Sequence, residues 1–201
     1  MTTHDADQPG LRERKKAKTR ASIREHALRL FREHGYGATT VEQIAEAAEV
    51  SPATFYRYFP TKEDVVLQDD FDVLTMDAFE AQPPTLSPIA AVRAAMAETL
   101  ASLTPEELDR FRESTELTLA IPEVRARAID EFSRTIQVMA EAVARRAGLP
   151  PDDFAARNLA GAITGVIMSA TLAALPMRSE PADVFAAIDA ALAHLEAGLP
   201  L

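Results

Sequence analysis

The chain has 201 residues, of which 47% are hydrophobic, enough for a buried core of ordinary size. It has no cysteine, which excludes disulfide bonds, thiolate metal sites and cysteine nucleophiles and is expected of a cytoplasmic protein. The net charge is −10, but the segment through Lys62 holds 11 of the 21 Lys and Arg residues and 8 of the 31 Asp and Glu residues, which gives +3 there and −13 in the rest. A basic segment on an acidic chain can bind phosphates locally while the remainder repels polyanions.

The first ten residues contain no apolar run, so residues 1–10 are expected to form a disordered tail and not a signal peptide. Ala, Leu, Glu and Arg dominate the rest, and no segment alternates as a strand would, which predicts an all-α protein of about nine helices. The first helix is predicted over 11–34, ended by Gly35 and Gly37. Its start carries a run of cations: Arg12, Arg14, Lys15, Lys16, Lys18 and Arg20. This run fits a phosphate-binding surface and a solvated helical turn equally well.

Two short helices are predicted next. The second is expected over 41–48, with Thr40 as its N-cap and Gln43 completing a capping box. The third is expected over 52–58, because Ser51 is a favourable N-cap and proline follows it. A pair of short helices joined by a tight turn behind a longer helix is typical of a helix-turn-helix, whose second short helix enters the DNA major groove.

The same residues form a long motif. Residues 39–45 read TTVEQIA, and residues 50–63 read VSPATFYRYFPTKE. With Leu30-Phe31 and Gly35-Tyr36 upstream, they resemble the tetracycline-repressor (TetR) family over about the first third of the chain. The resemblance implies a dimeric, all-α, DNA-binding regulator whose larger C-terminal domain binds a small effector.

The helix-turn-helix and the resemblance together predict these DNA-binding residues: Lys16, Lys18, Arg20, Thr39, Thr40, Ser51, Pro52, Ala53, Thr54, Tyr56, Arg57, Tyr58 and Lys62. Among them, Arg57 has the donors to bind a guanine edge, and Lys62 is expected to bind the phosphate backbone. Phe55 and Phe59 are expected in the core. Tyr36 is expected to be a packing residue, with a phosphate contact as the alternative.

Glu49 departs from the family pattern, because glycine is common at this position in the turn between the two short helices. Either Glu49 adopts a left-handed backbone, which costs a residue other than glycine roughly 1 kcal/mol, or the turn has a different geometry. The Glu49 carboxylate would also lie near DNA phosphates, so DNA binding is expected to be weaker than the count of cations suggests.

The boundary is expected inside the fourth helix, which would link the two parts rigidly, with a helix-turn-helix domain over 11–62 and an effector-binding and dimerisation domain over 63–201. Capping residues and prolines predict the later helices at 62–79, 88–103, from 104 onward, 122–148, from about 150 to 175, and 181–198.

An effector pocket is expected among the bulky apolar residues of the second domain: Phe71, Leu74, Met96, Leu100, Phe111, Leu117, Phe132, Ile136 and Met139. The alternative for most of them is an ordinary core. The arginine-rich segment 122–146 and the Asp152-Asp153 pair are similar to regulators of the mycofactocin type, which implies an acyl-CoA-like effector. The arginines are alternatively a solvated helix face.

Residues 158–177 carry no charge, and this segment is long enough for a membrane span. Its Ala, Gly, Ser and Thr content instead favours a buried or interface helix and no membrane partner. A homodimer seam is predicted on this helix and the next, at Gly161, Gly165, Met168, Leu172, Phe185, Ile188 and Leu192. The alternative is that these faces pack within one subunit.

The sequence thus predicts a DNA-binding transcriptional regulator, in particular a repressor released from a pseudo-palindromic operator by a small hydrophobic or acyl-type effector. A transcriptional activator or a ligand-independent regulator of the same fold is the alternative. An enzyme is not expected, because the four histidines form no metal-spaced pair and no phosphate loop or nucleophile elbow is present. No cofactor or metal is expected. A helical interaction module that never meets DNA would leave the basic run without a role.

Overall fold

The computed structural model describes residues 11–67, 71–174 and 180–200, and the predicted tail over 1–10 lies outside this range. The described residues form ten α-helices and no strand, which confirms the all-α prediction. The chain divides into two compact units, Met1–Gln68, called the head below, and Asp69–Leu201, called the body. The boundary thus follows Gln68 and not Lys62, because Val65 and Val66 are buried and their helix packs on the first helix of the head.

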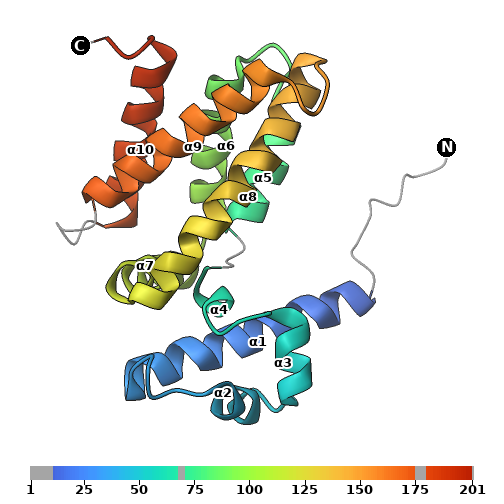
Figure 1. Ribbon diagram of the computed structural model, residues 1–201, viewed down its shortest axis with the longest axis vertical. Helices are drawn as coiled ribbons and strands as arrows, with labels where there is room; N and C mark the ends of the chain where they lie inside the picture. Colours follow the sequence, from blue (N-terminus) through green and yellow to red (C-terminus); the bar gives the residue numbers. More distant parts are fainter. Residues whose placement is uncertain (1–10, 68–70, 175–179, 201) are drawn as a thin grey trace. The chain divides into compact units, whose positions relative to one another are not determined.

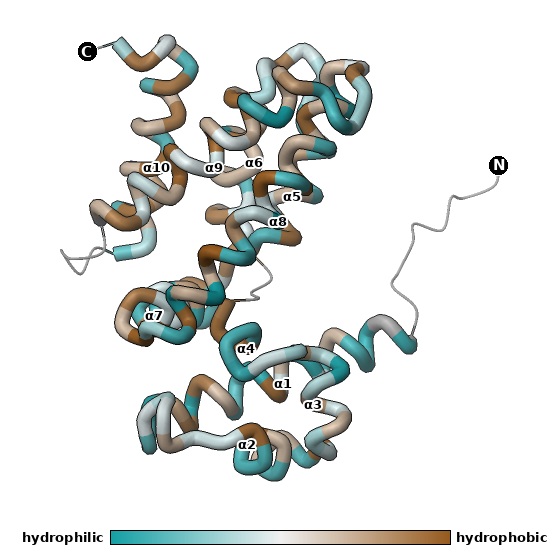
Figure 2. The backbone as a smooth tube through the Cα atoms, in the orientation of Figure 1, coloured by the Kyte–Doolittle hydropathy of each residue, from teal (hydrophilic) through white to brown (hydrophobic). Residues whose placement is uncertain are grey.

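The head contains four helices: α1 (Leu11–His34), α2 (Val41–Ala47), α3 (Pro52–Tyr58) and α4 (Asp64–Leu67). The first three agree with the predicted bounds to within one residue. Figure 1 shows α2 and α3 on one side of α1, whose N-terminal turns extend beyond them. These first turns are largely hydrophilic (Figure 2).

The core of the head includes apolar side chains that lie on one face of α1. On α1 the side chains of Ile23, Ala27, Leu30 and Phe31 are all buried. Phe55 and Phe59 are each 0% exposed, as predicted, and burial of such a ring stabilises the fold by about 1.5–3 kcal/mol. The core therefore fixes which face of α3 is turned inward.

The predicted helix over 62–79 differs from the structure. A turn precedes α4, which begins at Asp64. Thr61 and Asp64 are joined by reciprocal hydrogen bonds across this turn: the Thr61 amide donates to the Asp64 carboxylate at 3.0 Å, and the Asp64 amide donates to the Thr61 hydroxyl at 3.2 Å. The next helix, α5, covers Phe71–Ala81, and residues 68–70 between the two lie outside the described range.

The body contains α5 and five longer helices: α6 (Pro88–Ser102), α7 (Pro105–Ala120), α8 (Pro122–Ala147), α9 (Phe154–Ala174) and α10 (Pro181–Glu196). Four of these begin with proline at the first helical position, where its missing amide proton is not needed. A capping box of Thr104 and Glu107 begins α7, where a helix is predicted from 104 onward. Within the body, α9 packs against α8 and α10, while α6 packs against α5 and α10.

Candidate DNA interface

The turn from α2 to α3 is closed by two backbone hydrogen bonds. The Val50 amide donates to the Ala45 carbonyl oxygen at 2.9 Å, and the Glu49 amide donates to the Glu46 carbonyl oxygen at 3.0 Å. This Schellman pattern requires a left-handed residue, and Glu49 has a φ of 55°. Of the two alternatives for this turn, the structure has the left-handed backbone at Glu49.

Side chains at the predicted N-caps set the start of both short helices. The Gln43 amide donates to the Thr40 hydroxyl at 3.3 Å, and the Gln43 side chain accepts from the Thr40 amide at 2.8 Å. At α3 the Thr54 amide donates to the Ser51 hydroxyl at 3.1 Å. Each such cap stabilises its helix by about 1 kcal/mol. Thr40 and Ser51 remain exposed, so both can face DNA.

The outer face of α3 carries a small set of exposed or half-buried side chains. Pro52, Ala53 and Arg57 are exposed, and the Tyr56 side chain is 50% exposed. Thr54 and Tyr58 are half-buried, and the Arg57 guanidinium lies 5.4 Å from the centre of the Tyr58 ring. Because Phe55 anchors the inner face, Tyr56 and Arg57 are presented outward by the helical geometry.

Lys62 has a position that its predicted role did not anticipate. Its ammonium group donates to the carbonyl oxygens of Tyr36 at 2.9 Å and Thr39 at 3.0 Å, and it lies 4.0 Å from the centre of the Tyr36 ring. Two of its three donors therefore hold the α1–α2 loop in place. The lysine predicted to bind phosphate also ties together the backbone that leads into the Thr40 cap.

Tyr36 and Glu63 complete this arrangement. The Tyr36 hydroxyl donates to Glu63 Oε1 at 2.6 Å, and its ring packs 5.0 Å from that of Phe31, in agreement with the predicted packing role. Burial would raise the pKa of Glu63, but hydrogen bonds from Tyr36, the backbone and Thr61, with the charge of Lys62, outweigh it and lower that pKa. Glu63 is therefore ionised at neutral pH and holds the tyrosine in place.

The assignment of Thr39 to the DNA face is wrong for its side chain. Thr39 is only 1% exposed, and its hydroxyl donates to the Gly35 carbonyl oxygen at 2.9 Å, with the Leu30 carbonyl oxygen 3.3 Å away. The hydroxyl thus closes the end of α1 from inside the head. It cannot reach a phosphate without leaving the core.

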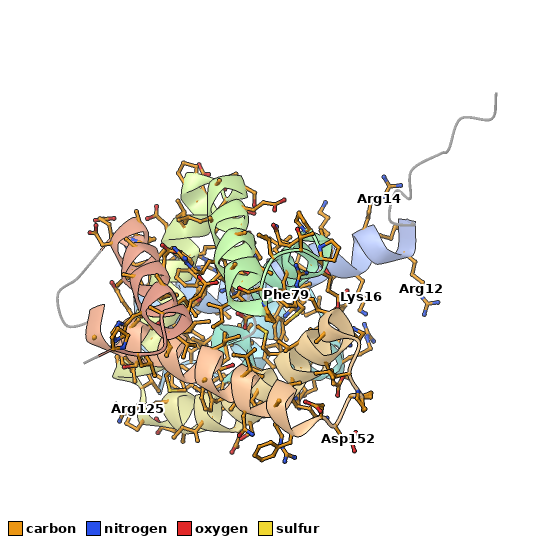
Figure 3. All side chains as sticks on the ribbon, turned by 90° about the horizontal axis from the view of Figure 1, so that it is seen from above. Arg12, Arg14, Lys16, Phe79, Arg125 and Asp152 are labelled. Atoms are coloured by element: carbon orange, nitrogen blue, oxygen red, sulfur yellow. The ribbon has the colours of Figure 1, made fainter. Side chains whose placement is uncertain are left out.

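The basic run lies along the start of α1. Arg12, Arg14, Lys16 and Lys18 are exposed, and Figure 3 shows Arg12 and Arg14 projecting to opposite sides of the helix. Arg20 is half-buried, with its guanidinium 5.5 Å from the centre of the Phe59 ring. Arg20 therefore packs against the core residue Phe59, whereas the earlier cations extend into solvent.

The residues predicted for an effector pocket do not form one group. A cavity of about 250 Å³ lies between α6 and α10, and of the predicted residues only Met96 and Leu100 line it. Leu74 is 42% exposed, and Met139 is buried in the body core. The remaining predicted residues, Phe71, Phe111, Leu117, Phe132 and Ile136, are half-buried. Of these, Phe71 and Phe111 pack against Phe185 of the body core.

The residues predicted for a dimer seam separate into two groups. Phe185, Ile188 and Leu192 are at most 6% exposed and belong to the core of their own subunit, so they are not available to a partner. The α9 residues differ: Gly161, Gly165 and Met168 are half-buried and Leu172 is 49% exposed. The membrane alternative finds no support, since none of the described helices combines the length and hydropathy of a bilayer span.

Comparison with known proteins agrees with this geometry. Residues 23–68 match the family model for bacterial regulatory proteins of the tetR family, and residues 86–200 match the model for the MftR C-terminal domain. The chain is 36% identical over 152 residues to the HTH-type transcriptional regulator TcmR of Streptomyces glaucescens, across 72% of this chain and 67% of that protein. It is 30% identical over 188 residues to MftR of Mycobacterium tuberculosis, which is named as a regulator of mycofactocin biosynthesis, across 92% and 93% of the two chains.

Among solved structures, FadR of Thermus thermophilus, a TetR-family repressor in complex with lauroyl-CoA, is 26% identical with a TM-score of 0.54 and covers 90% of this chain and 95% of its own. These relatives are transcriptional regulators and not enzymes. Both units of the chain are matched, the head by one family model and most of the body by the other. The chain therefore belongs to the TetR family of bacterial transcriptional regulators.

Proposed function

We propose that the protein is a cytoplasmic, homodimeric repressor that binds a pseudo-palindromic operator through α3 and leaves it when a small hydrophobic or acyl-type effector occupies the body. The observation that carries the proposal is the two-sided character of α3. Its inner face is anchored by Phe55, which is 0% exposed, while Tyr56 and Arg57 are exposed on the outer face. A short, capped helix held in this way is a rigid support for side chains that contact base edges.

The contacts to DNA divide into two classes. Arg57 reads a guanine through two hydrogen bonds, and Tyr56 and Thr54 contact neighbouring base edges or phosphates. Backbone contacts come from the caps and first residues of the two short helices, Thr40, Ser51, Pro52 and Ala53, and from the exposed α1 cations Lys16 and Lys18. The half-buried Tyr58 and Arg20 add contacts at the edge of this surface. Lys62 adds a contact to a phosphate through the third N–H of its ammonium group, since the other two donate to the carbonyl oxygens of Tyr36 and Thr39.

The dimer seam runs along α9. Gly161, Gly165, Met168 and Leu172 follow one another at intervals of three or four residues and so form one uncharged stripe. A Cβ atom added at Gly161 or Gly165 would meet nothing within 4 Å in its own subunit. Small residues of this kind permit close approach of a second helix, and a two-fold axis would bring the same stripe of the partner against it.

Effector binding acts through the distance between the two recognition helices. A dimer reads successive major grooves only when these helices lie about 34–36 Å apart. An effector lowers operator affinity only if it binds more tightly to a state with a different spacing. The complex of FadR with lauroyl-CoA provides a relative with an acyl ligand, which favours an acyl-type or hydrophobic effector for this chain.

The proposal is tested by a mobility-shift titration of the purified protein with the DNA that flanks its own gene, over a series of salt concentrations. We expect a specific complex whose affinity falls as salt rises. Arg57→Ala should weaken it about tenfold or more and relax base preference, since a bidentate contact discriminates by about 1–3 kcal/mol. Arg134→Ala, which removes an exposed arginine of α8, is the matched control and should leave affinity unchanged. Binding that is indifferent to both sequence and Arg57 would overturn the proposal.

A further inference from the structure

The cavity between α6 and α10 has almost entirely apolar walls. Met96 and Leu100 enter from α6, and Phe185 and Leu192 enter from α10. Three exposed alanines, Ala97 on α6 and Ala182 and Ala186 on α10, also line it, so the cavity is open to solvent on that side. The volume of about 250 Å³ corresponds to roughly eight water-sized groups at about 30 Å³ each, which suits a compact ligand.

Two of the residues that line the cavity form an ion pair. Arg93 donates through Nε to one Asp189 carboxylate oxygen at 2.7 Å and through a terminal nitrogen to the other at 3.0 Å. A third hydrogen bond runs from Arg93 to Glu196 at 3.2 Å. Their mutual hydrogen bond is the main cause that raises the pKa of Arg93 and lowers that of Asp189, so both are charged at neutral pH. The Asp189 side chain is 53% exposed, so it can return to water at small cost.

The apolar wall is connected to other helices of the body. The Phe185 ring lies 5.1 Å from that of Phe71 on α5 and 5.4 Å from that of Phe111 on α7, and these two rings lie 5.2 Å apart. Phe71 is the first residue of α5. It is also close in sequence to Gln68, where the head ends. A ligand that displaces Phe185 therefore acts on the start of the first body helix.

We propose that this cavity is the binding site for a compact apolar monocarboxylate, whose carboxylate replaces that of Asp189 on Arg93. The inference rests on the proposed function, because it supplies the effector class of a ligand-responsive regulator. The arginine fork is arranged for bidentate binding of a carboxylate, and the exchange preserves both of its hydrogen bonds. The apolar part of the ligand is buried against Met96, Leu100 and Phe185.

The exchange also gives the ligand a way to alter the body. Arg93 on α6 and Asp189 on α10 join two helices, and the Ser87 hydroxyl adds a second link to Glu196 at 2.7 Å. A ligand carboxylate on Arg93 breaks the link to Asp189 and leaves the link at Glu196. The two helices are then free to shift around the occupied cavity, which is the differential interaction that an effector needs.

The test is isothermal calorimetry of the full-length protein without DNA. The probes are benzoate and hexanoate, with benzamide and hexanamide as neutral analogues of the same size. We expect at least one carboxylate to bind and its amide to bind at least about tenfold more weakly. Arg93→Met should weaken the carboxylate by roughly ten- to hundredfold, while Arg112→Met, which removes an arginine paired with Asp109, should leave it unchanged.

Two further variants separate ligand binding from a purely structural role. Asp189→Asn removes the competing carboxylate and should tighten binding several-fold, whereas loss of a merely structural ion pair would weaken it. Ala186→Leu fills the cavity, keeps the ion pair and should abolish binding. Failure of both carboxylates to bind, equal binding of acid and amide, or weaker binding to Asp189→Asn would each overturn the inference. Operator binding is measured separately. A protein that binds DNA but no carboxylate would refute this inference alone. A protein that binds a carboxylate but no DNA would refute the proposed function alone.

Discussion

The ammonium group of Lys62 lies 4.0 Å from the centre of the Tyr36 ring and donates to the Tyr36 carbonyl oxygen at 2.9 Å. The lysine follows the helix-turn-helix, and the tyrosine precedes it. The contact therefore closes a loop around α2 and α3 and sets the chain direction that enters α2. It makes Lys62 part of the support of the DNA-binding unit.

Lys62→Met is predicted to affect both stability and DNA binding. The variant loses two hydrogen bonds from a charged group, and because the side chain is only half-buried we expect a loss of about 1–2 kcal/mol in the free energy of unfolding. Lys18→Met, at an exposed position, should change stability by less than about 0.5 kcal/mol but lower the salt slope of DNA binding by about 1. Urea unfolding measures the change in the free energy of unfolding, and DNA binding over a series of salt concentrations measures the salt slope. Equal stability of both variants would show that Lys62 has no supporting role.

Acid should destabilise the head through Glu63. The folded state lowers the pKa of this carboxyl from 4.5, despite burial, which would raise it, through hydrogen bonds such as that from Tyr36. The ionised form therefore adds stability above about pH 4.5, and this contribution is lost as the pH falls below that value toward the folded pKa. Tyr36→Phe removes the donor but keeps the ring, so its unfolding free energy should fall less steeply with acid. Thermal melts between neutral and acidic pH would reveal this difference, and parallel curves would contradict it.

Glu49→Gly should make the protein more stable. A left-handed backbone costs a residue with a Cβ roughly 1–2 kcal/mol, and the greater freedom of glycine in the unfolded chain offsets about 0.4–1 kcal/mol of that gain. We therefore expect a net increase of about 0.5–1 kcal/mol, seen as a higher Tm. Glu49→Gln retains the φ of 55° and should not raise the Tm, but it should strengthen DNA binding because it removes a negative charge beside α3. A Tm of Glu49→Gly at or below that of the parent would refute the strain argument.

Gly165→Leu should produce a monomer. The position offers open space within the subunit, so the subunit itself tolerates a side chain, but a bulky one would hold two α9 stripes apart. Gly165→Ala should instead stabilise the helix by about 0.5–1 kcal/mol. Light scattering after size exclusion measures the mass, with Ala126→Leu on the exposed face of α8 as the control. If the Gly165→Leu protein is still a dimer, the assignment of the dimer interface to α9 is wrong.

Local chemistry explains why much of the head was predictable. The caps at Thr40 and Ser51 depend on residues three positions away, and the left-handed Glu49 follows from the short turn in which it lies. Lys62 and Thr39 were predicted less well because their partners are backbone carbonyl groups, some of them far away in sequence. Every residue type has a carbonyl group, so no pattern in the sequence marks such a partner.

The body shows a second limit of sequence reasoning. An apolar stripe at helical spacing predicts burial, which Phe185, Ile188 and Leu192 confirm, but it does not say whether the covering surface belongs to the same chain or to a partner. Arg93 and Asp189 lie far apart in sequence, so their contact depends on how α6 and α10 pack. The cavity they border could not be predicted from either helix alone.

Hydroxyl-radical footprinting of the operator fragment, combined with the stoichiometry of binding at saturation, tests the central claim most directly. We predict two protected half-sites whose centres are one helical turn, about 10–10.5 base pairs, or a multiple of it apart, and two protomers for each bound site. Arg57→Ala should weaken protection at both half-sites together. A monomeric protein that protects no promoter fragment would contradict the claim that α3 of a paired molecule enters the major groove.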